Sequence, residues 1–150
     1  MPALTDSCIY TILHRKRLRE AVRSGGRGTF HETKPWTTGA KLWTKAQGAK
    51  EIVPIVFADA TDCTRLLYWG ALSDIYIDET GTTFTVEGLT SVGGIRSPQD
   101  LILCSSGRAI APNFIRPYAI CRTPKFFQDR LRHNKRLQPS ALGETAKRRG

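Results

Sequence analysis

Asp59 and Asp62 are the two carboxylates whose spacing most suggests chemistry, because they directly follow an apolar segment, 52–58. Two carboxylates at the end of a buried strand can hold a divalent metal ion for phosphodiester cleavage. Aspartates in such positions also cap helices and form turns. We favour capping and turn formation, so we expect no metal and no other cofactor. A metal-dependent enzyme acting on nucleic acid or a nucleotide is kept as the alternative.

Aromatic and arginine side chains form a more suggestive set. Several flat rings flank predicted loops or strand ends, where a ring can stack on an exposed base at about 1–3 kcal/mol per base. A nearby arginine can bind a phosphate or a base edge. Packing in the core is the competing interpretation for each tryptophan. The predicted base or ligand pocket consists of Trp36, Trp43, Trp69, Arg116 and Tyr118.

Strong catalytic motifs are missing from the sequence. It has no GxxxxGK[ST] or GxGxxG phosphate loop, no HExxH and no GxSxG. The three histidines, His14, His31 and His133, lie far apart. We therefore name no catalytic residue, and the enzyme class stays uncertain, with a non-enzyme favoured.

The net charge of +10 is concentrated in two segments, 14–27 with +5 and 122–150 with +7, while 28–121 carries −1. Such asymmetry is typical of a protein that meets a polyanion. Arginine dominates both segments, and its planar fork suits phosphate. A basic surface that only aids solubility, and an acidic or membrane partner, are the alternatives; neither segment has the apolar face of a membrane-surface helix. The predicted phosphate-binding residues are Arg15, Lys16, Arg17, Arg19, Arg23, Arg27, Arg130, Arg132, Lys135 and Arg136.

The apolar runs are of strand length and none approaches the roughly 20 residues of a membrane span. The first basic residue is Arg15, so the start lacks the pattern of a secretory signal. No two of the four cysteines, Cys8, Cys63, Cys104 and Cys121, lie within four positions. We expect reduced thiols and a cytoplasmic location.

The elements that would position these residues follow from hydrophobic periodicity. We predict strands at 8–13, 52–58 and 101–105, a hairpin over 72–86, and a last strand at 114–122 interrupted by Pro117. A helix is predicted over 14–24, a short one through 65–69, and a long irregular segment from Arg27 to Gly48. The fold class is therefore α+β, with a mostly antiparallel sheet curled into a small barrel and flanking short helices. Residues 1–132 form one domain, followed by a basic tail, 133–150.

Four segments resemble a PUA-like domain, closest to the EVE/ASCH branch: VPIVFADA (53–60), LYWGALSDI (67–75), TTFTVEGL (82–89) and FIRPY (114–118). The resemblance implies a small curled barrel whose aromatic-lined pocket holds a base, often in modified DNA or RNA. We therefore expect a nucleic-acid-binding module, with DNA or RNA as partner and a protein partner possible. A small-molecule-binding or partner-docking protein without catalysis is the further alternative.

Overall fold

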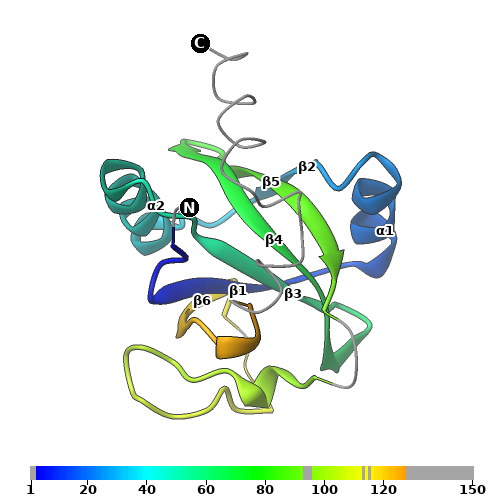
Figure 1. The fold of residues 1–150 in the computed structure, drawn as a ribbon. Helices are drawn as coiled ribbons and strands as arrows, with labels where there is room; N and C mark the ends of the chain where they lie inside the picture. The colour runs from blue at the N-terminus through cyan, green and yellow to red at the C-terminus, as the bar shows by residue number, and fades with distance from the viewer. Residues whose placement is uncertain (1–2, 93–95, 113, 115, 128–150) are drawn as a thin grey trace.

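The computed structural model describes residues 3–92, 96–112, 114 and 116–127, which form one six-stranded sheet with two α-helices (Figure 1). The elements in chain order are β1 (Ser7–Leu13), α1 (Arg15–Arg23), β2 (Gly28–Glu32), α2 (Thr37–Ala49), β3 (Pro54–Asp59), β4 (Asp62–Asp78), β5 (Gly81–Ser91), the 3₁₀ helix η1 (Pro98–Asp100) and β6 (Tyr118–Arg122).

The sheet has the strand order β2-β5-β4-β3-β1-β6, and only β1 and β3 pair in parallel. The chain reaches β3 from β1 through α1, β2 and α2, which supplies the long connection that parallel neighbours need. The predicted α+β class with a mostly antiparallel sheet is confirmed. As described, the sheet is open, with β2 and β6 as its outer strands.

β1 and α1 form close to where the sequence predicts them. Leu18 and Ala21 are the buried side chains of α1, as the apolar stripe requires. The helix ends before Gly25 and Gly26, whose φ angles of 84° and 85° favour glycine. The first strand and the first helix are therefore confirmed.

The prediction of an irregular segment from Arg27 to Gly48 is wrong. Its first part is β2, where Phe30 pairs with Phe84 of β5. Its second part is α2, although glycine lowers helix propensity there. Thr82 anchors the connection between them, because its buried hydroxyl accepts from the Trp36 N–H and donates to the Lys34 carbonyl, both at 2.8 Å. Tertiary contacts thus supply the order that local sequence does not signal.

The predicted short helix at 65–69 is also wrong, because these residues belong to β4. Asp59 does accept a backbone N–H two residues on, from Thr61, as a helix cap would. The same bond forms in tight turns, and here it closes the β3–β4 hairpin, in which Asp59 pairs with Asp62. The hairpin predicted over 72–86 is confirmed, and its pairing extends back to Tyr68 of β4 and forward to Ser91 of β5.

The chain after β5 is less regular than predicted. Residues 101–105 form single bridges instead of a strand, through Ile102 with Ala109 and Leu103 with Cys121. The last strand, β6, begins at Tyr118, directly after Pro117, so Phe114, Arg116 and Pro117 lie outside it. The segment with residues 101–105 lies beside β6 at the bottom of Figure 1.

Two hydrophobic clusters cover the two faces of the sheet. Ile9 belongs to one cluster and Tyr10 to the other, as the alternation of side chains along a strand requires. The cluster around Ile9 includes Leu18 of α1 and Ala46 of α2, so both helices cover that face. The cluster around Tyr10 includes Leu101 from the segment after β5. We call the side around Ile9 the helix face and the side around Tyr10 the Tyr10 face.

No helix in the described ranges is long and apolar enough to span a bilayer. The predicted basic tail, 133–150, lies outside the described residues.

Candidate nucleic-acid interface

Helix α1 carries five of the predicted phosphate-binding residues, and its local sequence decides which of them face solvent. The His14 side chain begins the helix by accepting the Lys16 N–H at 3.2 Å. Because Leu18 and Ala21 are buried, the opposite side of a helix with 3.6 residues per turn carries Lys16, Arg19 and Arg23. All three are exposed.

Three other basic residues of this segment hold α1 and its flanks against the sheet. Arg15 forms an ion pair with Asp59 at 2.7 Å, and Arg27 forms one with Glu87 of β5. Burial raises the pKa of Glu87, although the Arg27 guanidinium acts in the opposite direction. The Arg17 guanidinium lies over the ring of Phe30, 5.2 Å from its centroid. These cations therefore have structural partners.

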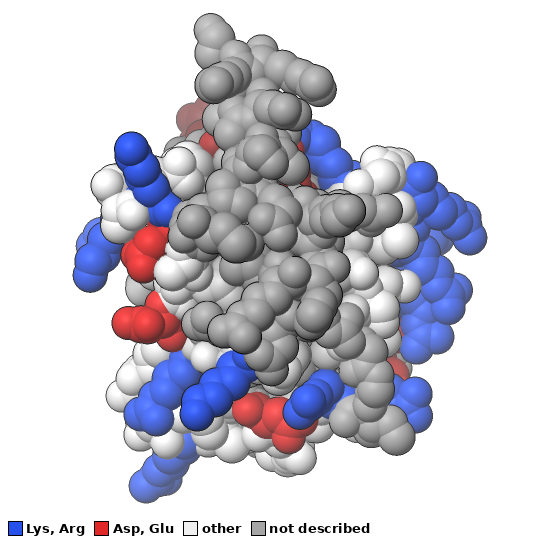
Figure 2. Space-filling model, in the orientation of Figure 1, with Lys and Arg blue, Asp and Glu red and all other residues white. Residues whose placement is uncertain are grey.

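Lys16, Arg19 and Arg23 have no ion pair within the described part of the chain. They form the α1 stripe, which spans about 10 Å at 1.5 Å per residue. Glu20 is the one acidic residue of α1, and it lies beside the stripe. Figure 2 shows lysine and arginine side chains gathered on the right flank, where α1 lies in Figure 1. The stripe is thus a concentrated positive surface with weak internal neutralisation.

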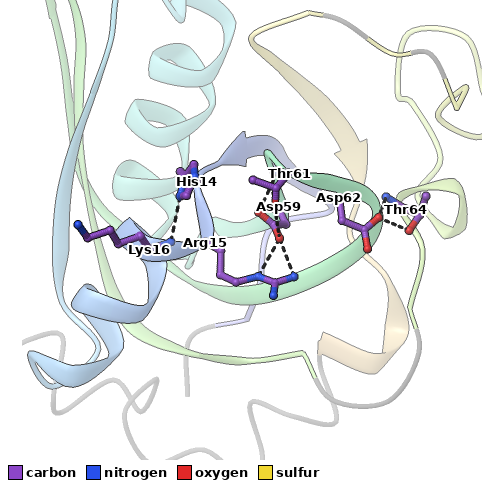
Figure 3. Close-up of polar contacts among 7 residues, drawn as sticks. All are labelled: His14, Arg15, Lys16, Asp59, Thr61, Asp62 and Thr64. Atoms are coloured by element: carbon purple, nitrogen blue, oxygen red, sulfur yellow. Dashed lines mark hydrogen bonds and ion pairs between the residues drawn. The ribbon is translucent and has the colours of Figure 1, made fainter.

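Asp59 links α1 to the β3–β4 hairpin (Figure 3). Its side chain is fully buried, and Arg15 Nε donates to its Oδ2 at 2.8 Å. Thr61 donates its N–H to Oδ1 and its hydroxyl to Oδ2, at 3.0 and 2.8 Å. Burial alone would raise the pKa of Asp59, but the bonds from Thr61 and the Arg15 guanidinium outweigh it and hold the pKa below its ordinary value. Asp59 therefore stays ionised and fixes Arg15.

Asp62 and Asp59 have separate hydrogen-bond partners. The Asp62 Oδ1 accepts both the N–H and the hydroxyl of Thr64, and these bonds lower the pKa of Asp62. Figure 3 shows the Asp62–Thr64 pair separate from the Asp59 cluster. Among the described residues, no group of three or more histidine, cysteine, aspartate or glutamate side chains fits a metal ion. The favoured interpretation of these aspartates, turn formation, agrees with their contacts.

The predicted tryptophan pocket is not assembled. Trp36 is 1% exposed and stacks on Phe84 and on Tyr118, with ring centroids 4.5 and 4.6 Å apart. Trp69 is fully buried on the Tyr10 face and stacks on Phe127 at 4.4 Å. Because Trp36 and Trp69 lie on opposite faces of the sheet, they cannot line one pocket. Their rings fill the core on separate sides of the sheet, so the structure does not bring them together as the sequence predicts.

The other predicted pocket residues are also dispersed. Trp43 is half-buried against the helix-face cluster. Tyr118 is half-buried in the Trp36 stack, and its hydroxyl accepts the Gly39 N–H at 3.3 Å. Arg116 is exposed. Trp36 and Tyr118 are therefore brought together, but as core packing.

Four predicted phosphate-binding residues lie outside the described residues, so the structure bears on only six of the ten. The four are Arg130, Arg132, Lys135 and Arg136.

A cleft that the sequence did not reveal lies on the Tyr10 face. It has a volume of 130 Å³ and is bounded by Tyr10, Thr64 and the segment from Ser97 to Phe114. This segment has little regular structure, so no periodicity in the sequence indicates that it folds over β1 and the start of β4. The sequence signals near it are the predicted strand at 101–105 and the FIRPY segment at 114–118, and neither indicates a cleft.

Comparisons with protein-family models, with curated proteins and with solved structures found no match to this chain.

Proposed function

We propose that this protein binds nucleic acid, with the sugar-phosphate backbone lying along the α1 stripe. The observation that carries the proposal is that the basic residues of the first basic segment, 14–27, fall into two groups, those that contact the sheet and those that do not. Arg15, Arg17 and Arg27 have partners in the sheet, whereas the three cations of the stripe have none among the described residues. Cations with a structural role need no polyanion, but three aligned cations that form no ion pair and have one acidic neighbour, Glu20, favour one.

The spacing of the stripe suits a phosphate backbone. About 10 Å of helix covers roughly three phosphates of one B-form strand at 3.4 Å of axis each. Arginine at two of the three positions allows bidentate contacts with phosphate oxygens. Contacts of this kind give affinity with little sequence information, so this surface would position a strand and not select its bases.

Arg15 extends the same surface toward the β3–β4 hairpin. Its Nε and Nη2 both contact Asp59 Oδ2, which fixes the plane of the guanidinium. The Arg15 side chain is still 41% exposed, and its Nη1 has no hydrogen bond to a described residue. A guanidinium held by a buried carboxylate loses less freedom when it binds a phosphate. Arg15 would therefore add a pre-oriented contact beside the stripe.

The kinship with PUA-like domains, including closure of the sheet into a small barrel, belongs to this proposal as well. It is supported by the order of strands and helices and by the four segments that resemble that family. The basic residues after 127 would add phosphate contacts. A cytoplasmic location is supported by the free thiols of Cys8, Cys104 and Cys121.

A salt titration tests the proposal. Fluorescence anisotropy would follow binding of the full chain to short single- and double-stranded DNA and RNA between about 50 and 200 mM salt. Three phosphate contacts predict a slope of log affinity against log salt near −2 for single strands and near −3 for a duplex, before contributions from other basic residues. Absence of binding at low salt, or affinity independent of salt, would refute the proposal.

A further inference from the structure

The cleft on the Tyr10 face is the feature that the α1 stripe does not explain. Its side chains come from β1, the start of β4, the 3₁₀ helix η1 with its cap, and the segment after η1. The six used below are Tyr10, Thr64, Ser97, Gln99, Ala111 and Phe114. We propose that it holds one unstacked pyrimidine base of a single strand. This inference rests on the proposed function and deepens it, because it names where base selection occurs and which bases fit.

The volume of the cleft limits what can enter. At 130 Å³ it is close to a protein cavity of about 150 Å³ that accepts benzene. It therefore has room for one six-membered ring with small substituents. A purine carries a second fused ring and would need the cleft to widen. Size alone thus favours a pyrimidine.

The walls of the cleft offer the contacts that a flat heterocycle needs. Phe114 is half-buried and offers an aromatic surface to the cleft, and Tyr10, which is 1% exposed, supports it with ring centroids 5.9 Å apart and planes inclined by 57°. The amide of Gln99 has both donors and an acceptor, which matches the mixed edge of a pyrimidine. The Ser97 hydroxyl oxygen accepts the backbone N–H of Gln99 at 3.1 Å, and this hydroxyl donates no hydrogen bond to a described residue.

Two arginines flank the segments that form the cleft. The Leu66 N–H donates to the Arg96 carbonyl at 2.9 Å, which joins the start of β4 to the segment before η1. Arg96 precedes Ser97 and is exposed, whereas Arg65 alternates with Thr64 along β4 and so points away from the cleft. The Arg96 guanidinium lies 4.4 Å from the centroid of Phe126, which restricts its position. A strand whose base enters the cleft would thus pass Arg96 beside Ser97.

The cleft is connected to the α1 stripe through one hairpin. Arg15 at the start of α1 holds Asp59 at the end of β3, and Thr64 lies just beyond the β3–β4 turn (Figure 3). A strand that follows the stripe past Arg15 would therefore pass this turn before it reaches the cleft. The arrangement separates phosphate binding on α1 from base selection in the cleft beside Phe114.

The test compares homopolymeric oligonucleotides of equal length by anisotropy at one salt concentration. Thymidine and cytidine strands should bind about fivefold or more tightly than adenosine strands, the ratio expected for one stacked base. Ala111→Leu, which fills the cleft from an exposed position without removing core atoms, should abolish this preference. Ala111→Ser is the matched control and should retain it. Phe114→Ala should widen the cleft and raise adenosine binding relative to pyrimidine binding.

The outcomes separate this inference from the proposed function. Equal binding of all strands, or a preference that Ala111→Leu leaves unchanged, would overturn the cleft assignment while nucleic-acid binding stands. Failure of the intact protein to bind any strand would overturn both. An NMR titration with free cytidine and adenosine distinguishes a strand from a free nucleoside. If the protein binds no oligonucleotide but cytidine shifts the NMR signals of Phe114 and Ala111, a free pyrimidine nucleoside would replace the nucleic-acid strand as the partner.

Discussion

Arg15 and Asp59 are joined across 44 residues by two contacts to one carboxylate oxygen, Oδ2, at 2.8 and 2.7 Å. The pair is asymmetric, because Asp59 is fully buried whereas the Arg15 side chain is 41% exposed. Loss of the arginine would leave a buried carboxylate without its cation, whereas loss of the carboxylate would leave an arginine that water can still solvate. The pair therefore stabilises the fold mainly by satisfying Asp59, and it places Arg15 as a consequence.

This asymmetry predicts unequal effects of two substitutions on the free energy of unfolding at pH 7. Arg15→Met should cost about 2–3 kcal/mol, below the upper values for buried pairs because Arg15 is partly solvated. Asp59→Asn should cost about 1–2 kcal/mol, since it keeps the shape of the side chain. Urea unfolding of both variants measures the difference. Equal losses, or a larger loss for Asp59→Asn, would contradict this account of the pair.

The lowered pKa of Asp59 also predicts how the pair depends on pH. The folded pKa lies below the ordinary unfolded value near 4, so the contribution of Asp59 is complete above that value and is lost as the pH falls through the folded pKa. The gap in unfolding free energy between the wild type and Asp59→Asn should therefore shrink below about pH 4. A gap that stays constant down to pH 2 would be inconsistent with a stabilised carboxylate.

The tryptophans should respond to unfolding and not to ligand. Trp69→Ala should cost about 3–5 kcal/mol, because it removes a fully buried ring stacked on Phe127. The Trp36 and Trp69 indoles should be shielded from iodide before and after nucleic acid is added. Quenching of indole emission and thermal unfolding provide the measurements. Strong iodide quenching of either ring in the folded protein would mean that the ring is accessible to a base after all.

Gly81 is predicted to be intolerant of any side chain. Its φ of 124° disfavours other residues, and a Cβ there would lie 2.1 Å from the Glu32 carbonyl oxygen of β2. Gly81→Ala should therefore destabilise the fold by about 2 kcal/mol or more through strain at the β2–β5 edge. Gly48→Ala is the control, because nothing lies within 4 Å of the corresponding Cβ position. Thermal unfolding should separate the two variants, and equal melting temperatures would disprove the close approach.

Glu20 should weaken the proposed partner's binding in the wild type. It lies beside the α1 stripe and opposes the field of its three cations. Glu20→Gln should raise the affinity for oligonucleotides by about two- to fivefold at low salt, and the gain should decline at high salt. Anisotropy titrations at two salt concentrations give both numbers. A lower affinity for the variant would argue against phosphate on this face.

Local sequence signals were sufficient for part of the fold. The apolar stripe of Leu18 and Ala21 predicts α1, and the Glu79–Thr80 turn between alternating segments predicts the β4–β5 hairpin. Both signals arise from residues close in sequence. The parallel pairing of β1 with β3 has no such signal, because it depends on residues more than 40 positions apart.

The errors have a common physical cause, which is tertiary contact overriding local propensity. Helix α2 lacks a side-chain cap, yet Trp36 and Ala46 bury it against the sheet. The cap-like bond of Asp59 forms in a hairpin turn instead of a helix. The basic character of α1 was evident from sequence, but the separation of paired from unpaired cations required the positions of Asp59 and Glu87.

The central claim concerns the α1 stripe, and a matched pair of charge reversals tests it most directly. Arg19 and Arg23 lie four residues apart on α1, and Lys41 and Lys45 lie four residues apart on α2; all four are exposed. The two helices lie on opposite sides of Figure 1. The double variants Arg19→Glu/Arg23→Glu and Lys41→Glu/Lys45→Glu therefore change the net charge equally on different surfaces.

The deciding measurement is oligonucleotide affinity at low salt for the wild type and both double variants. Thermal unfolding first verifies that each variant is folded. The α1 reversal should lower the affinity by at least about tenfold and reduce the steepness of the salt dependence by nearly two contacts. The α2 reversal should change both by much less. Equal losses in the two variants, or a larger loss from α2, would contradict the assignment of the phosphate backbone to α1.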